Sequence, residues 1–193
     1  MITYTPDDIR LLEHRQVFVF GSNTAGNHFG GAAWTAHRLF GAKLGVAFGM
    51  TEHCFAIPTC TADHKRVQDD ELLDSISQFL DYVSTDVDHD TYFVTRIGCG
   101  IAHWQPDEVR KLFWKAVFSK DCVQIWQLRK IILPKDFLKT EEEKSIYFAW
   151  QACHDLYLRK GENDELYANA YRSYVNDIQT IKEQYVADQK RTL

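Results

Sequence analysis

Long apolar runs are absent from this chain of 193 residues. No segment reaches the roughly 20 apolar residues that a membrane-spanning helix needs. The first residues, MITYTPDDIR, lack the basic-then-apolar pattern of a secretory signal. We therefore expect no membrane partner and a cytoplasmic location.

Paired cysteines are also missing. The five cysteines are an odd number at scattered spacings, which argues against a disulfide framework and agrees with a reducing compartment. No C-x-x-C pair accompanies His53, Cys54, Cys60 and His64, so the usual ligand spacing of a zinc site is absent. We expect no metal and assign no cofactor.

Basic residues are in the minority, because 22 Lys and Arg stand against 27 Asp and Glu. Proteins that bind nucleic acid usually present a basic face, so a net charge of -5 argues against nucleic acid as a partner. At 45% hydrophobic and 25% charged, the chain has the composition of a globular protein with a full core.

The most informative stretch that is present covers residues 17–33, VFVFGSNTAGNHFGGAA. Four apolar, β-favouring residues, Val17 to Phe20, end at Gly21, and Gly30-Gly31 opens a run from Ala32 to Phe40 that suits a helix. Backbone N–H groups at such a loop and at a helix N-terminus attract anions. We predict that a phosphate-bearing small molecule binds here.

Strand and helix signals alternate along the first two thirds of the chain. This order predicts an α/β fold with a mostly parallel sheet covered on both faces. In such sheets ligands lie beyond the carboxyl ends of the strands, where a second glycine loop, Gly98-Cys99-Gly100, is also expected. The expected helices are 5–14, 32–40, 69–83 and 106–118. The expected strands are 17–20, 54–57 (halted by Pro58), 91–95 and one or more within 123–133, and 42–53 is a loop or weak strand.

From Thr140 the composition becomes acidic and aromatic, without a strand signal. Apolar residues recur at steps of three and four, which predicts two antiparallel helices around a turn at 161–164. The chain would then comprise an α/β domain at 1–138 and a helical hairpin at 139–193. The apolar seam either packs on the domain or forms a homodimer or partner surface through 140–193. Its residues are Ile146, Trp150, Cys153, Tyr157, Tyr167, Tyr171, Tyr174, Ile178, Ile181 and Tyr185.

Neither glycine loop matches a common nucleotide signature. A P-loop needs Lys and Ser or Thr directly after its last glycine, where Ala32 and Ala33 stand. A dinucleotide fingerprint needs a second glycine where Asn23 stands. Asn23 either positions a ribose or a water, or caps a turn. Trp104 either stacks on an adenine or covers an edge of the core.

Candidate groups for proton transfer are His28 and His103, which lie in or next to the glycine loops. Cys99 is either a nucleophile or a small residue beside a phosphate. Asp63 and Lys65, in the polar loop after the second strand, are either an acid and a cation of the site or part of a solvated loop.

The combination FVFGSN…GNHFGGAA…FAIPT…VTRIGCG resembles small bacterial and phage proteins related to macrodomains, over about residues 17–133. The resemblance implies a three-layer α/β/α domain with a mixed sheet and with ADP-ribose, or a related NAD-derived nucleotide, in a cleft across the strand ends. It places Asn23 beside the distal ribose. The implied ligand-binding residues are Gly21, Ser22, Asn23, Gly30, Gly31, Ala32, Gly98, Cys99, Gly100 and Ile101.

Two functions follow from this resemblance. The first is binding of ADP-ribose, with hydrolysis of an ADP-ribosyl bond as an added activity in which Asn23 and His28 or His103 orient water. In the hydrolases most similar at the second loop an acidic residue follows the glycines, and here Ile101-Ala102-His103 stands in that place. The alternative is a non-catalytic interaction or scaffold protein that acts through its C-terminal hairpin.

Overall fold

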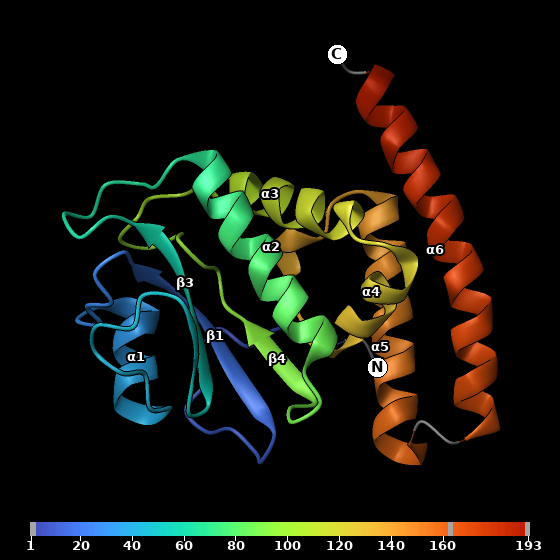
Figure 1. Cartoon of the computed structure of the whole chain (residues 1–193), viewed down its shortest axis with the longest axis horizontal. Coiled ribbons are helices and arrows are strands. Elements are labelled where there is room, and N and C mark those ends of the chain that lie inside the picture. The colour runs from blue at the N-terminus through green and yellow to red at the C-terminus, as the bar shows by residue number, and fades with distance from the viewer. Residues whose placement is uncertain (1–2, 162–163, 192–193) are drawn as a thin grey trace.

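The computed structural model describes residues 3–161 and 164–191. It contains a five-stranded mixed sheet in the order β2-β3-β1-β4-β5. Figure 1 labels its three central strands, β3, β1 and β4, which lie side by side. Strands β1, β3, β4 and β5 are parallel, and β2 pairs with β3 in the antiparallel sense. The strands are β1 (Gln16–Asn23), β2 (Gly49–Thr51), β3 (Cys54–Cys60), β4 (Thr91–Val94) and β5 (Ile131–Ile132).

Four of the helices begin at a capping side chain. Capping boxes start α2, α3, α4 and α5, at Gln68, Gln105, Asp121 and Thr140. Among the described residues, no helix is both long enough and apolar enough to cross a membrane. The helices are α1 (Gly31–Leu39), α2 (Asp69–Thr85), α3 (Pro106–Ser119), α4 (Cys122–Gln127), α5 (Glu141–Lys160) and α6 (Glu165–Arg191).

Strand β1 is buried on both faces, and its alternate residues belong to two separate cores. Val17 and Val19 lie in the larger core, with residues of α2 and α3, whereas Phe18 and Phe20 lie in the smaller core, with residues of α1. The sheet therefore has helices on both faces, as the alternation of strand and helix signals predicts.

The predicted helix at 5–14 is wrong, because this segment has no helix or strand. The backbone N–H of Thr5 donates to the carbonyl of Leu133 at 3.0 Å, and its hydroxyl donates to the carbonyl of Ile132 at 2.8 Å. Ile9 is buried in the smaller core. These long-range bonds to the end of β5 replace the local capping that favours a helix in isolation.

Strand β3 continues to Cys60, so the prediction that Pro58 halts it is wrong. The antiparallel partner β2 pairs only with Cys54, Phe55 and Ala56. Pro58 lies beyond this stretch, where its missing N–H removes no hydrogen bond to β2. The extension carries Thr59 and Cys60 to the end of the sheet where the glycine loops lie.

Residues 123–133 contain the last strand, as predicted, but this strand is short and most of the segment is helical. Asp121 accepts a hydrogen bond from the N–H of Gln124 at 2.7 Å and so starts α4. A 3-10 turn follows at Leu128–Lys130, and only Ile131 and Ile132 pair as a strand. The periodicity of a short apolar run does not distinguish a helix from a strand. Here the N-cap at Asp121 favours the helix.

The two C-terminal helices form and pack along each other, as predicted (Figure 1). Residues 162–163 of the predicted turn lie outside the described residues. Ile146, Trp150 and Ile178 join the larger core, and Tyr167 packs against Trp126 of α4. The apolar seam thus packs on the α/β domain, which is the first of its two predicted roles. A homodimer through 140–193 stays a prediction.

Candidate functional site

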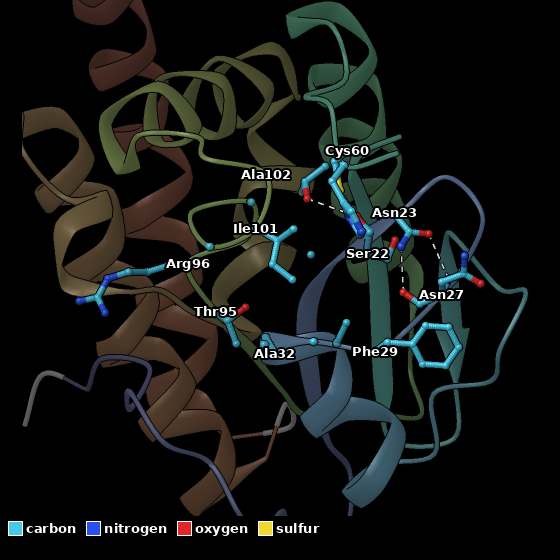
Figure 2. Close-up of a pocket in the computed structure, with 18 of the residues that line it drawn as sticks. Ser22, Asn23, Asn27, Phe29, Ala32, Cys60, Thr95, Arg96, Ile101 and Ala102 are labelled. Atoms are coloured by element: carbon cyan, nitrogen blue, oxygen red, sulfur yellow. Dashed lines mark hydrogen bonds between the residues drawn. The ribbon is translucent and has the colours of Figure 1, made fainter. Parts of the chain in front are cut away.

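Both glycine loops line one cavity of about 280 Å³ (Figure 2). The first loop, residues 24–30, connects β1 to α1, and the second loop, residues 95–105, connects β4 to α3. Because β1 and β4 are parallel, both loops leave the same edge of the sheet. The cavity lining includes every predicted ligand-binding residue except Cys99, namely Gly21, Ser22, Asn23, Gly30, Gly31, Ala32, Gly98, Gly100 and Ile101.

The two loops meet at the cavity. A Cβ atom on Gly30 would lie 2.8 Å from Cδ1 of Ile101, so the loops touch at this point. Ile101 is nevertheless half exposed, and its side chain stands between the loops in Figure 2. The predicted convergence of the glycine loops is therefore present in the fold.

The N-terminus of α1 faces the cavity, since Gly31, Ala32 and Ala33 belong to the lining. Its N-cap residue, Gly30, has no side chain to accept a hydrogen bond, and its first turn holds no acidic residue. The first N–H groups of a helix have no partner within the helix and carry partial positive charge. This helix end therefore suits an anion.

The charges of the side chains that line the cavity also suit the binding of an anion. Among the described residues that line the cavity, none is Asp or Glu, although the chain is acidic overall. The lining holds one arginine, Arg96, whose guanidinium donates to Asp7 at 2.6 Å and to Asp136 at 2.7 Å. These carboxylates raise the pKa of Arg96 further, so it stays charged.

A second cavity, of about 440 Å³, adjoins the first. The two share Gly31, Ala32, Thr95, Arg96 and Gly100 in their linings. The outer wall of the second cavity is the N-terminal segment 5–9, which contributes Asp7 and Asp8. The joined cavities form a cleft whose first part lacks carboxylates and whose second part has them.

Asn23 is nearly buried and uses its amide within the first loop. Its Oδ1 accepts hydrogen bonds from the N–H groups of Ala25 at 3.1 Å and Asn27 at 3.0 Å, and its Nδ2 donates to the carbonyl of Asn27 at 2.9 Å (Figure 2). Of its two predicted roles, the structure shows the turn cap. Contact with a ribose stays a prediction.

The two histidines predicted for proton transfer are not brought together. Neither His28 nor His103 belongs to the cavity lining; His103 is exposed and His28 is fully buried. The Nε2 atom of His28 lies 3.2 Å from the carbonyl oxygen of Lys43, and its ring packs edge-on against Phe20. His28 therefore anchors the first loop to the interior of the protein.

The first loop is also tightly packed against residues 43–46. Gly45 donates its N–H to the carbonyl of Gly26 at 3.1 Å, and a Cβ atom on Gly26 would lie 2.5 Å from the backbone of Gly45 and Val46. Gly26 has a positive φ of 66°, which glycine adopts without strain. Only glycine fits this position.

Burial of His28 predicts a pH dependence of stability. Burial lowers the pKa of His28, so the unfolded chain takes up a proton at a higher pH than the folded chain does. The contribution of His28 to stability is complete above pH ~6.5 and is lost as the pH falls below it. Urea unfolding of His28→Gln between pH 7.5 and 5 should show a smaller loss of stability than the wild type. Identical pH slopes would contradict this assignment.

Cys99 does not line the cavity, and its place beside a phosphate stays a prediction, whereas Trp104 takes the structural one of its two predicted roles. Burial raises the pKa of Cys99 to about 11, so its thiol stays protonated and is a poor nucleophile. Trp104 is buried, its indole N–H donates to the carbonyl of Thr59 at 2.9 Å, and the guanidinium of Arg66 lies 3.7 Å from the ring centre. Trp104 covers an edge of the core.

His64 also lines this cavity, although it is not among the predicted site residues. It lies in the loop after β3, whose end carries Thr59 and Cys60 into the same lining. The sequence signal for His64 is the position of this polar loop directly after a parallel strand, where ligands of such sheets bind. Asp63 and Lys65, its neighbours, form an exposed ion pair at 2.8 Å and are absent from the lining.

No group of three or more His, Cys, Asp or Glu side chains within residues 3–161 and 164–191 is arranged to hold a metal ion. Comparisons of the chain with protein-family models, with curated proteins and with solved structures return no match.

Proposed function

We propose that the cleft binds ADP-ribose or a related NAD-derived nucleotide. One observation carries the proposal: the uncapped N-terminus of α1 and the second glycine loop line the same cavity, and that cavity has no carboxylate among its described residues. Two sets of backbone N–H groups would then hold a diphosphate from opposite sides.

The shape of the cleft supports a ligand with groups on both sides of the diphosphate. The second cavity extends past the N-terminus of α1, where Gly31 and Ala32 belong to both linings. Asp7 and Asp8 would accept hydrogen bonds there from ribose hydroxyls or from an exocyclic amine. The first cavity would take the other ribose.

The sequence resemblance supports the same ligand. The macrodomain-like arrangement that it implies is a three-layer α/β/α domain with both glycine loops at the carboxyl ends of the strands. A mixed sheet between helices, with two glycine loops at one edge, agrees with that expectation. A scaffold role of the hairpin is less favoured, because its apolar seam already packs on the domain.

Thermal unfolding with and without ADP-ribose tests the proposal. At a ligand concentration 100 times Kd, the ligand should stabilise the native state by about 2.7 kcal/mol. For a protein of this size that corresponds to a rise in Tm of roughly 5–10 °C. Adenosine, which lacks phosphate, is the control and should give a much smaller shift. Unchanged melting with ADP-ribose, ADP and NAD would overturn the proposal.

A further inference from the structure

We propose that Asp7 holds Arg96 in the place of a ligand phosphate, so that binding exchanges one anion for the other and releases the N-terminal segment. This exchange rests on the proposed nucleotide site and adds an autoinhibitory contact to it. The ion pair joins two walls of the second cavity, because Asp7 belongs to the segment 5–9 and Arg96 to the loop 95–105 after β4.

Arg96 lies where the two cavities join. It lines both of them, together with Gly31 and Ala32 at the N-terminus of α1, where the anion is expected. Its side chain nevertheless points away from the first cavity in Figure 2. The guanidinium donates from Nη1 to Asp7 at 2.6 Å and from Nε to Asp136 at 2.7 Å. The one arginine among the described lining residues of the first cavity is therefore turned toward carboxylates of the protein.

The two carboxylates that hold the guanidinium differ in exposure. The side chain of Asp136 is 33% exposed, whereas that of Asp7 is 82% exposed. Water and salt screen an exposed ion pair, so the contact with Asp7 is the weaker of the two. Because Asp136 accepts from Nε and Asp7 from Nη1, Asp136 keeps Arg96 oriented when Asp7 leaves. Asp7 is therefore the carboxylate that a phosphate displaces.

The chain is anchored on both sides of Asp7. Thr5 is bonded to the end of β5 through its N–H and its hydroxyl, and Ile9 is buried in the smaller core. Between these two anchors, residues 6–8 are exposed and have no helix or strand. They contribute to the outer wall of the second cavity. Loss of the ion pair with Arg96 can therefore move this wall without unfolding the core.

Phosphate is a stronger partner for a guanidinium than an exposed carboxylate. A phosphate accepts two parallel hydrogen bonds from one guanidinium, and a diphosphate at α1 gains further from the helix N-terminus. A ligand without phosphate cannot replace Asp7, so the contact discriminates against neutral nucleosides. After the exchange, the carboxylate of Asp7 is available to accept a hydrogen bond from a ribose hydroxyl in the second cavity.

Calorimetric titration with ADP-ribose tests this exchange in the wild type, Asp7→Asn and Asp8→Asn. Asparagine keeps the size and one acceptor oxygen of aspartate and removes its charge. Asp8 lines the same cavity and pairs with Arg10 at 2.6 Å, so Asp8→Asn is a matched control for the lost charge. We expect Asp7→Asn to bind ADP-ribose about three to five times more tightly than Asp8→Asn, which is the range of an exposed ion pair.

Arg96→Gln shows whether Asp7 acts through this arginine. This variant should bind ADP-ribose at least roughly tenfold more weakly than the wild type, because it loses a charged hydrogen-bond donor. In the Arg96→Gln background, Asp7→Asn should bring no gain over Asp8→Asn, since a double-mutant cycle isolates the interaction between two paired side chains. Thermal unfolding without ligand checks that each variant is folded.

The outcomes separate this inference from the proposed function. Equal affinities of Asp7→Asn and Asp8→Asn, or a gain from Asp7→Asn that persists without Arg96, overturn the exchange and leave the binding proposal intact. Binding by Asp7→Asn where the wild type shows none supports both. Absence of ADP-ribose binding in the wild type and in every variant overturns the proposed function and this inference with it.

Discussion

Glu143→Ala will lower the free energy of unfolding by about 3 kcal/mol, because among the described residues it leaves the buried guanidinium of Arg110 with only Asp107, which is 36% exposed, as a carboxylate partner. The side chains of Arg110 in α3 and Glu143 in α5 are 8% and 2% exposed, and they form an ion pair. The same carboxylate accepts hydrogen bonds from the N–H groups of Lys139 at 2.8 Å and Thr140 at 3.0 Å. One substitution therefore removes half of the capping box of α5 together with the ion pair between α5 and α3.

Urea unfolding followed by circular dichroism measures this loss. Glu141→Ala is the matched control, since it removes the same charge from the same helical turn. The Glu141 side chain is 85% exposed and, within the described part of the chain, forms an ion pair only with Lys144, so its removal should cost less than about 1 kcal/mol. Equal losses in the two variants would show that the ion pair between Arg110 and Glu143 contributes little to the stability of the fold.

Gly100→Val will weaken ADP-ribose binding by at least roughly 100-fold, or about 2.7 kcal/mol. Gly100 lines both cavities and has no positive φ, and apart from its chain neighbours no atom lies within 4 Å of the position that a Cβ would take. A valine side chain would therefore occupy the open cleft without straining the backbone. Gly98 is a poor choice for this test, because its φ is 74° and a Cβ would lie 2.7 Å from Trp104.

The Gly100 variant is informative only if it stays folded, so Tm without ligand is measured first and should equal that of the wild type. Ala187→Val adds similar bulk at an exposed position of α6, outside both linings, and should keep the full ligand-induced shift. Wild-type affinity in Gly100→Val would mean that the nucleotide binds elsewhere.

The sequence predicts those elements whose signals are local. The apolar spacing from Leu72 to Val83 and the acidic start at Asp69 give α2 almost to the residue, and Pro106 marks the start of α3. The wrong predictions concern segments whose structure depends on contacts with residues that are distant in the sequence. Thr5 bonds to the end of β5, and the limited length of β2 lets Pro58 remain in a strand.

The same contrast between local sequence signals and contacts with distant residues holds at the candidate site. Glycines after two parallel strands predict a shared cavity, because parallel strands end at one edge of the sheet. Side-chain direction is not encoded so locally. His28 turns inward toward Lys43, and His64 lines the cavity from a turn whose left-handed backbone the sequence spacing does not reveal.

The packing of Gly26 against Gly45 and Val46 has a consequence for how a ligand would associate. A loop fixed by neighbouring backbone, and by His28 beneath it, is already ordered before a ligand arrives. Binding to such a preorganised loop loses little conformational entropy. Association should therefore be a single fast step without a slow rearrangement, and affinity should come mainly from a slow release of the ligand.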